Sequence, residues 1–229
     1  MARRRFFATR VATGEAEIVG AGAAHLARVL RVEVGQEYEL AHAGQVYLGR
    51  VARVSPRAVG FALVAALPAP APTPPLAVAA ALFKFDRFEW MLEKATELGL
   101  SRLQLLATRR TDPRLLAAAP KRLERWHTIA VEAAQQARRA DWPEIAPPQT
   151  LADFLAEPLG GAKVLLSEEP GGARLGLVSG TLTLLTGPEG GFAPEELAAA
   201  EAAGYAPTSL APRILRCETA ILAALARAQ

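Results

Sequence analysis

The feature that most constrains the fold is a proline-rich stretch, PAPAPTPP, at residues 68–75. It holds five prolines in eight residues, and proline is excluded from helix interiors and central strands while favouring extended polyproline structure. The hydrophobic pattern changes there, from short alternating segments to longer apolar runs and helical stripes. The sequence therefore predicts two domains, at residues 1–67 and 76–229, joined by a linker at residues 68–75.

The first domain has the pattern of a small β-barrel. Residues 37–54 (EYELAHAGQVYLGRVARV) alternate apolar and polar side chains around a turn at His42, Ala43 and Gly44, as a hairpin does. Residues 57–67 predict a further strand, and residues 23–32 predict one short helix. Several strands and one helix in so short a segment favour a barrel.

The second domain alternates strands with helices, which is typical of an α/β fold with a largely parallel sheet. Residues 76–83 (LAVAAALF) form an apolar run, as expected for a strand covered on both faces. Residues 86–99 predict a helix that Asp86 caps and Gly99 ends, and residues 120–140 predict a longer helix. The remaining predicted strands are 102–108, 163–169, 181–187 and 207–211, and the remaining helices are 194–203 and 216–228.

Composition places the chain among ordinary globular proteins. Hydrophobic residues make up 51% of its 229 residues, enough for a buried core. Cys217 is the single cysteine, so no intrachain disulfide forms and a reducing compartment is expected. Glu15 and Glu17 interrupt the basic N-terminus before a signal-peptide core can form, and no apolar run approaches the roughly 20 residues of a spanning helix. We expect a soluble cytoplasmic protein.

The basic surplus lies in the first third of the chain. Residues 1–75 carry nine arginines and five glutamates, whereas the whole chain has a net charge of +3. Such a surplus attracts polyanions such as nucleic acid, although many solvated surfaces are also basic.

A glycine-rich turn follows the predicted strand at residues 181–187. The stretch LLTGPEGGFAPEE, residues 184–196, contains neither the dinucleotide-binding pattern G-x-G-x-x-G nor a phosphate loop ending in Gly-Lys-Ser/Thr. Glu189 within the turn would repel a triphosphate but tolerate a neutral or cationic ligand, such as S-adenosylmethionine. The alternative is a tight strand-to-helix corner in which Glu195 or Glu196 favours the helix start.

A second late stretch, LAPRILRCETAILAAL at residues 210–225, favours a binding site over a simple corner. It reads as a strand end, a proline turn, two arginines and a helix. Ile214 and Leu215 lie in the turn itself, and apolar side chains in a polar turn suggest a wall for an aromatic ring such as adenine.

Together, LTGPEGGFAPEE and LAPRILRCETAILAAL resemble the C-terminal signature of the SPOUT superfamily of RNA methyltransferases, most closely its 16S ribosomal RNA uridine-N3 methyltransferase (RsmE) family. Residues 25–40 resemble the PUA-like N-terminal region of that family, and residues 89–111 and 122–145 resemble its central stretches. The likeness covers the chain apart from the linker and residues 150–180. One departure is Cys217, where the family usually has threonine, so we expect its contact to be weakened or lost and activity to be retained.

The resemblance implies a C-terminal domain with a trefoil knot, a PUA-like N-terminal barrel, and a homodimer whose second subunit completes the active site. It also implies that S-adenosyl-L-methionine is the cofactor and that ribosomal RNA of the small subunit is the substrate. The residues expected to hold the cofactor are Leu166, Thr186, Gly187, Pro188, Glu189, Gly190, Gly191, Leu210, Ile214, Leu215, Arg216 and Thr219.

Methylation of uracil N3 requires removal of its proton and alignment with the methyl donor. We assign Arg216 to steering the anionic uracil or a phosphate, and Glu218 to orienting that arginine or accepting the proton. The alternative for this pair is a helix cap and a salt bridge. Cys217 as a covalent nucleophile suits attack at pyrimidine C6, not at N3. No metal is needed, and His25, His42 and His127 share no ligand-like spacing.

Several basic residues are candidates for RNA contact, since arginine pairs with phosphate. Phe6 and Phe7 either stack on bases or begin the first strand. Arg28 and Arg31 are predicted one turn apart on the short helix. The RNA candidates are Arg3, Arg4, Arg5, Arg10, His25, Arg28, Arg31, Arg109 and Arg110.

Two other functions remain open at the level of sequence. One is an RNA-binding or ribosome assembly factor without catalysis, and the other is a methyltransferase for another RNA, such as transfer RNA. A nucleotide-binding metabolic enzyme would need phosphate-binding chemistry that the sequence lacks.

Overall fold

In the computed structural model, residues 3–68, 74–168, 175–176 and 180–228 are described. The chain forms two compact units, one of Met1–Pro72 with Ala134–Asp141 and the other of Thr73–Ala133 with Trp142–Gln229. Most of the predicted linker, residues 69–73, lies outside the described residues. The inclusion of residues 134–141 in the first unit has no counterpart in the sequence prediction.

The first unit contains one six-stranded sheet with the order β1-β4-β5-β6-β3-β2. Strand β1 runs parallel to β4, and the other neighbours are antiparallel. The predicted hairpin is confirmed, because β4 and β5 pair from Glu37 with Arg50 to His42 with Gln45. The strands are β1 (Arg5–Phe7), β2 (Arg10–Ala12), β3 (Glu15–Val19), β4 (Glu37–His42), β5 (Gln45–Val54) and β6 (Ala58–Leu67).

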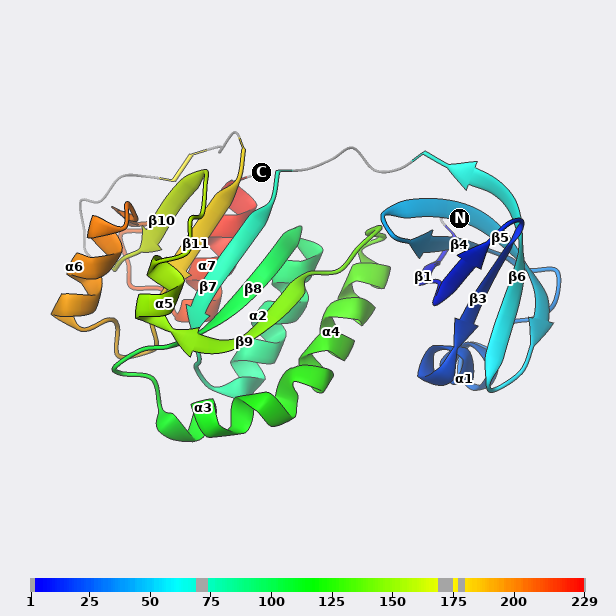
Figure 1. Cartoon of the computed structure of the whole chain (residues 1–229), viewed down its shortest axis with the longest axis horizontal. Coiled ribbons are helices and arrows are strands. Elements are labelled where there is room, and N and C mark those ends of the chain that lie inside the picture. Colours follow the sequence, from blue (N-terminus) through cyan, green and yellow to red (C-terminus); the bar gives the residue numbers. More distant parts are fainter. Residues whose placement is uncertain (1–2, 69–73, 169–174, 177–179, 229) are drawn as a thin grey trace. The chain divides into compact units, whose positions relative to one another are not determined.

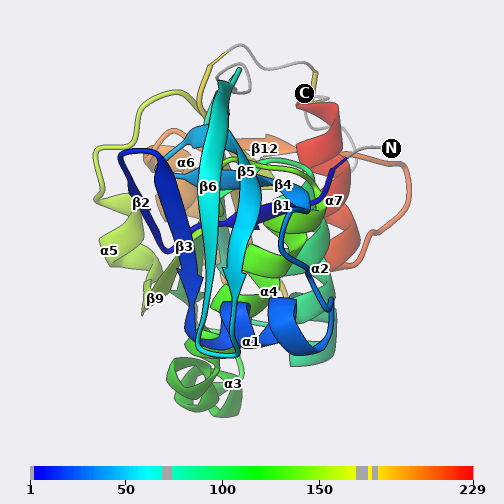
Figure 2. The same ribbon diagram turned by 90° about the vertical axis from the view of Figure 1, so that its right-hand side faces the viewer.

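The helix of this unit, α1 (Gly20–Arg28), lies at one end of the sheet (Figure 2). The prediction of a helix over residues 23–32 was wrong at both ends. The chain leaves the helix after Arg28, and Arg31 adopts a left-handed φ of 51°, so Arg28 and Arg31 do not lie one turn apart on a helix. Ala23 and Leu26 of α1 join Phe6, Leu40, Val51 and Phe61 in the core of this unit.

The second unit is an α/β fold with a six-stranded sheet, and all neighbouring strands are parallel, as predicted. The strand order is β12-β10-β11-β7-β8-β9. The strands are β7 (Leu76–Ala81), β8 (Leu100–Ala107), β9 (Glu144–Thr150), β10 (Ala162–Leu166), β11 (Leu182–Thr186) and β12 (Ala206–Thr208). Strand β9 was not predicted, because Pro147 and Pro148 mask its pattern.

Helices cover both faces of this sheet (Figure 1). One face packs against α2 (Phe85–Glu97), α4 (Leu123–Gln136) and α7 (Cys217–Arg227), and its core includes Phe88, Trp126 and Ile221. The other face packs against α5 (Leu151–Leu155) and α6 (Pro194–Ala202) through Phe154 and Ala200. The apolar strand runs follow from this two-sided burial.

Two helix predictions were wrong in detail. Asp86 does not cap α2, because the N-cap position is Lys84 and Asp86 lies in the first turn. The range 120–140, predicted as one helix, is instead a 3-10 segment (Ala119–Arg122) followed by α4, which ends at Gln136, and a separate helix, α3 (Pro113–Ala118), precedes it. Asp112 caps α3 by accepting a hydrogen bond from the Arg114 N–H at 2.8 Å, which starts the helical region earlier than Pro120.

Candidate functional site

A cavity of about 480 Å³ in the second unit opens where strands β10, β11 and β12 end. Its wall includes Leu166, Thr186 and Thr208, which are the last residues of those three strands. Ligands in open parallel sheets bind outside the carboxyl ends of the strands. The loops that follow these ends, residues 166–168, 186–192 and 208–218, supply most of the lining.

The glycine-rich turn forms one side of the cavity, and its backbone conformation explains why two of its positions are glycine. A Cβ atom on Gly187 would lie 3.1 Å from Cδ2 of Phe192 and 3.2 Å from the backbone carbon of Gly191. Gly191 has a φ of 69°, and its N–H donates to the Pro188 carbonyl at 2.8 Å. Glycine therefore closes the turn against its own backbone, and Pro188, Glu189 and Gly190 face the cavity.

Glu195 and Glu196 belong to the helix start that follows the turn. The Glu196 carboxylate accepts hydrogen bonds from the N–H groups of Ala193 and Arg109, each at 2.8 Å. Glu195 pairs with the Arg109 guanidinium. Arg109 does not line the cavity, whereas Arg110 does and donates to the Gly190 carbonyl at 2.8 Å. The alternative of a strand-to-helix corner, in which a glutamate favours the helix start, is thus correct for α6. The turn before α6 also borders a cavity.

The second late loop lies opposite and brings apolar and basic side chains to the same cavity. Leu210, Ile214 and Leu215 line it, and Ile214 is 77% exposed. Arg216 lines it as well and is exposed. Within the part of the chain that the structure describes, no side-chain hydrogen bond or ion pair involves Arg216.

Glu218 in the first turn of α7 is buried, and its nearest cation is not Arg216. Its Oε1 lies 3.9 Å from Nε of Arg87, a residue in the first turn of α2. Nη1 of Arg87 also donates to Oε1 of Glu189 at 3.2 Å. The sequence analysis missed Arg87, because nothing in the helical stripe around it indicates that α2 begins beside two distant loops.

Cys217, whose contact the sequence analysis expected to be weakened or lost, makes one hydrogen bond at this site. Its Sγ lies 3.5 Å from the Gly187 carbonyl, to which it donates a sulfur hydrogen bond. Burial, and then the negative charges of Glu218 and Glu189, raise the pKa of the Cys217 thiol to about 11. The thiol is therefore neutral near pH 7, which does not suit a nucleophile.

All residues predicted to hold the cofactor line this cavity except Thr219, which is exposed on α7 and absent from the lining. Both predicted catalytic residues, Arg216 and Glu218, also line it. Besides Arg87, the residues of the lining that the sequence analysis missed include Ser167, Glu168, Phe192, Ser209 and Arg213. Loop residues such as these carry no periodic signal.

The candidate RNA-binding arginines of the first unit differ in their surroundings. Arg5 is 9% exposed and donates to Glu39 at 2.8 and 3.0 Å, which leaves little of its side chain available for the predicted RNA contact. Phe6 is buried in the core and packs against Tyr38, as the first-strand alternative predicted. Arg3 pairs with Glu37 at 3.0 Å. His25, Arg4, Arg28 and Arg31 are exposed.

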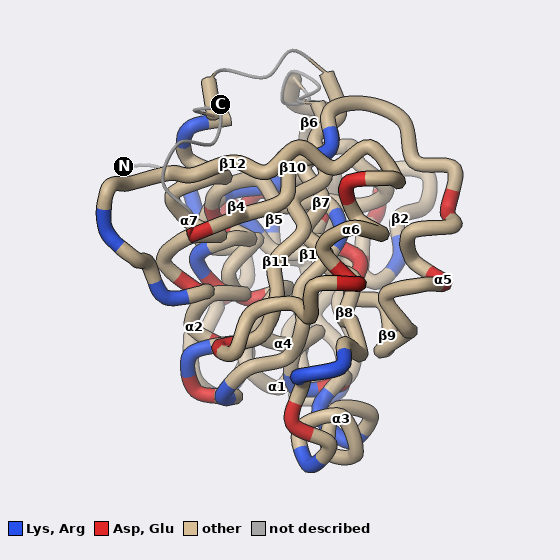
Figure 3. The backbone as a smooth tube through the Cα atoms, turned by 90° about the vertical axis from the view of Figure 1, so that its left-hand side faces the viewer, with Lys and Arg blue, Asp and Glu red and all other residues tan. Residues whose placement is uncertain are grey.

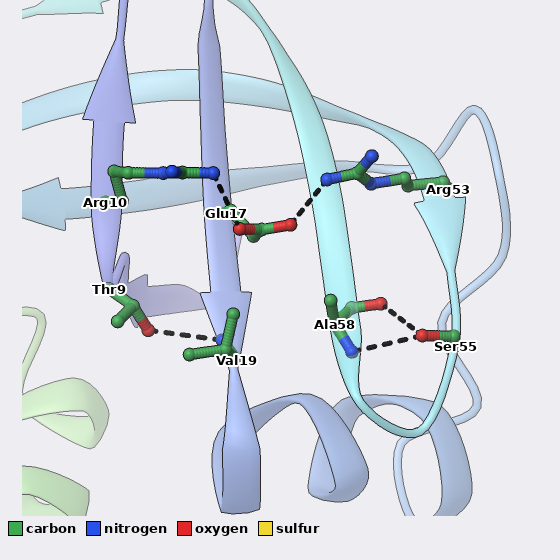
Figure 4. Close-up of polar contacts among 7 residues, drawn as sticks. All are labelled: Thr9, Arg10, Glu17, Val19, Arg53, Ser55 and Ala58. Carbon is green, nitrogen blue, oxygen red and sulfur yellow. Dashed lines mark hydrogen bonds and ion pairs between the residues drawn. The ribbon is translucent and has the colours of Figure 1, made fainter.

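Arg10 belongs to a row of charges that crosses four strands (Figure 4). Glu17 on β3 accepts from Arg10 on β2 at 3.0 Å and from Arg53 on β5 at 2.5 Å. Gly60 of β6 lies between Glu17 and Arg53 in the register, and the absence of a side chain there lets the two meet. A Cβ on Gly60 would lie 2.7 Å from Nε of Arg53. Glu17 thus forms ion pairs with two arginines whose side chains are largely exposed.

The described residues contain neither a metal-binding cluster nor a membrane-spanning helix. Among them, no three His, Cys, Asp or Glu side chains gather in a way that would hold a metal ion. No helix in the described ranges combines the length and the apolar character needed to cross a membrane.

Comparison with known proteins gives consistent family matches. The profile of the RNA methyltransferase domain family matches residues 69–229. The ribosomal RNA small subunit methyltransferase E of Synechocystis is 39% identical over 162 residues, 67% of this chain and 52% of that protein. The protein of the same name from Mycobacterium bovis is 34% identical over 215 residues, 88% of this chain and 80% of that protein. The chain thus aligns with about half of the first relative and four fifths of the second.

Solved structures match over both units. A ribosomal RNA small subunit methyltransferase E from Neisseria gonorrhoeae, bound to S-adenosyl methionine, superposes with a TM-score of 0.87 at 26% identity, covering 98% of this chain and 96% of that one. A methyltransferase from Legionella pneumophila in complex with the same cofactor has a TM-score of 0.86 at 27% identity, covering 99% and 96%. The family profile and the Mycobacterium relative together establish that the chain belongs to the RNA methyltransferase family, in its ribosomal RNA small subunit methyltransferase E (RsmE) group.

Proposed function

We propose that the chain is an S-adenosylmethionine-dependent methyltransferase that acts on N3 of a uridine in small-subunit ribosomal RNA. The observation that carries this proposal is the single cavity to which both late loops contribute, Thr186–Phe192 and Thr208–Glu218, in a chain of the RsmE group. Relatives of that name act on ribosomal RNA of the small subunit, and two structural neighbours are bound to the cofactor.

The lining residues fit this cofactor in size and in chemistry. A volume of about 480 Å³ falls within the range of small-molecule sites, roughly 300–1,000 Å³. Leu166, Leu210, Ile214 and Leu215 offer apolar surface for an adenine ring. Glu189 and the buried Glu218 offer negative charge for a cationic donor. When bound, S-adenosylmethionine would supply the methyl group from its sulfonium.

Two residues of this chain would stabilise the uracil anion and accept its N3 proton. Arg216, exposed and free of a carboxylate partner among the described residues, would stabilise the uracil anion that forms as the N3 proton leaves. Glu218, buried in the wall of the same cavity, would accept that proton directly or through water. Thr219, which is exposed and does not line the cavity, has no role in this proposal.

For RNA binding we propose the exposed residues Arg4, His25, Arg28 and Arg31, together with Arg110 at the cavity. Arg3 and Arg10 are weaker candidates, because each already pairs with a glutamate. Arg53 is a further weaker candidate, because it shares Glu17 with Arg10. Arg109 is a weaker candidate for the same reason, because it pairs with Glu195. Arg5 is not proposed, since it is buried.

The family relationship also supports finer features of the chain. We infer that the second unit carries a trefoil knot, that the first unit is a PUA-like barrel, and that two copies form a dimer in which each completes the active site of the other. The convergence of three late loops on one cavity is compatible with the knot. The expected cytoplasmic location also stays a prediction.

The proposal is tested by nucleoside analysis of small-subunit ribosomal RNA from a strain that lacks the gene. We expect 3-methyluridine to disappear from that RNA and to return when the intact gene is supplied. Persistence of 3-methyluridine would contradict the proposed substrate. Calorimetry with the cofactor separates the two open alternatives, because an assembly factor without catalysis would release no heat of binding, whereas a transfer RNA enzyme would bind it and leave the ribosomal nucleoside unchanged.

A further inference from the structure

Arg87 lies between two carboxylates at the edge of the cavity. Its Nη1 is 3.2 Å from Oε1 of Glu189, and its Nε is 3.9 Å from Oε1 of Glu218. The Arg87 side chain is 30% exposed, that of Glu189 is 53% exposed, and that of Glu218 is 10% exposed. One guanidinium thus faces a solvated carboxylate on one side and a buried one on the other.

The three residues come from three separate parts of the second unit. Arg87 is in the first turn of α2, Glu189 is in the glycine-rich turn, and Glu218 is in the first turn of α7. Helices α2 and α7 pack against each other, with Phe88 and Ile221 both fully buried in one core. Because Phe88 directly follows Arg87 and Ile221 follows Glu218 on α7, that core anchors both Arg87 and the start of α7, whereas Glu189 lies in a loop outside it.

Glu218 depends on this arginine more than Glu189 does. A buried carboxylate without a compensating partner is costly, whereas an exposed one is satisfied by water. Among the described residues, Arg87 is the only cation within 4.0 Å of the Glu218 carboxylate. Helix α2 carries both signs of charge along its length (Figure 3), but Arg87 is its one charged residue that lines the cavity.

The surroundings of Arg87 argue against a role as an RNA contact. Two neighbouring carboxylates already balance its charge, so a phosphate placed there would meet net negative charge. Arg216 differs, since it is exposed and has no carboxylate partner among the described residues. The geometry therefore separates two arginines at the same cavity, one that faces the solvent side and one that faces protein carboxylates.

We propose that Arg87 is a positioning residue for methyl transfer. It holds the Glu218 carboxylate at the cavity wall and ties it, through Glu189, to the glycine-rich turn. The loops after β11 and β12 thereby keep the spacing that a donor and an acceptor in line require. This inference rests on the proposed function, because it assigns Arg87 to the same reaction.

The test uses the full-length chain, small-subunit ribosomal RNA and labelled S-adenosylmethionine in single-turnover reactions with excess enzyme. The variants are Arg87→Ala, Arg87→Lys, Glu218→Gln and the double variant R87A/E218Q. Arg125→Ala is the matched control, because Arg125 pairs with Glu89 of the same helix α2 at 2.7 Å and does not line the cavity. Cofactor affinity is measured by calorimetry, and RNA affinity is measured at several salt concentrations.

We expect Arg87→Ala to slow the methyl-transfer step about 10- to 100-fold, the scale of a small misplacement of reacting groups. Cofactor affinity should change by less than about threefold, and the salt dependence of RNA binding should stay as in the unaltered chain. Arg87→Lys should restore part of the rate, because it keeps the charge but cannot reach both carboxylates. Arg125→Ala should react at the unaltered rate.

The double variant decides whether Arg87 acts through Glu218. If it does, R87A/E218Q is no slower than E218Q alone, within about threefold, because coupled residues are not additive. Additive losses, an unaltered rate in Arg87→Ala, or a flatter salt dependence would each overturn the assignment. An unaltered chain that methylates no ribosomal RNA would instead contradict the proposed function and, with it, this role.

Discussion

Arg216 and Glu218 are two residues apart, yet they have opposite environments. Arg216 is exposed, whereas Glu218 is 8% exposed and faces Arg87. Side chains two positions apart at a helix start point to different sides, so these two do not pair with each other. The alternative of a helix cap and a salt bridge is met in part, because Arg216 is at the N-cap position of α7 and Glu218 pairs with Arg87. The separation leaves Arg216 free to meet a ligand.

Replacing Arg216 with alanine tests that freedom directly. We expect the methyl-transfer rate to fall about 100-fold, since a cation that faces a developing anion contributes on that scale. Thermal stability should stay unchanged, because Arg216 has no polar side-chain partner among the described residues. Single-turnover rates and melting curves measure both effects. Normal turnover together with unaltered RNA affinity would remove the role assigned to Arg216.

Cys217 gives a prediction for stability at high pH. Its pKa is raised from 9.0 to about 11, mainly by burial, so folding favours the neutral thiol. A raised folded-state pKa stabilises the protein fully below the unfolded value, and this contribution is lost between about pH 9 and pH 11. We expect a loss on the order of 1–2 kcal/mol, reduced by partial solvent exposure. The urea midpoints of the unaltered chain and of Cys217→Ala are compared from pH 8 to pH 11. If the midpoint depends on pH equally in both proteins, the prediction is contradicted.

At the scale of elements, Gly161 determines how β10 enters the sheet. It lies directly before β10, has a φ of 86°, and a Cβ there would lie 2.3 Å from the Thr181 carbonyl oxygen. That oxygen accepts a hydrogen bond from the Ala162 N–H at 2.8 Å, so the backbone cannot move aside without loss. Strand β10 pairs with both β11 and β12, and any displacement would reach the cavity.

Gly161→Ala should therefore destabilise the chain by about 2 kcal/mol or more, through left-handed strain and a backbone clash. Gly160→Ala is the matched control, because a Cβ there meets nothing within 4 Å and its φ is not positive. That control should be neutral or stabilise by about 0.4–1 kcal/mol. Urea denaturation of both variants gives the comparison, and similar midpoints would show that the predicted clash is relieved at little cost.

This element also shows how far sequence analysis reaches. Apolar periodicity predicted the strands of the parallel sheet other than β9, including β10 and β11, and the helices α2, α6 and α7. It could not indicate why position 161 must be glycine, because the clash is with Thr181, which is distant in sequence. The same holds at the site. Motifs identified the two late loops, but Arg87 reaches them only through packing of α2 against α7.

At the scale of the whole molecule, the arginines of residues 1–75 differ in whether a glutamate already pairs with them. Arg3 and Arg50 share Glu37, and Arg10 and Arg53 share Glu17. Each glutamate cancels one of its two arginines. One positive charge therefore remains in each of these groups, held beside its glutamate. The exposed arginines without an ion-pair partner among the described residues are Arg4, Arg28, Arg31 and Arg57.

The salt dependence of RNA binding distinguishes these two sets of arginines. Each free arginine that contacts a phosphate releases counterions, and its removal flattens the plot of log affinity against log salt by roughly 0.7–0.9. We expect the double variant R28A/R31A to lose about twice that slope. Arg10→Ala should change it by much less, because Glu17 already holds that guanidinium at 3.0 Å. Binding of small-subunit ribosomal RNA at several salt concentrations measures both slopes, and equal changes would mean that the glutamate pairs do not limit which arginines meet RNA.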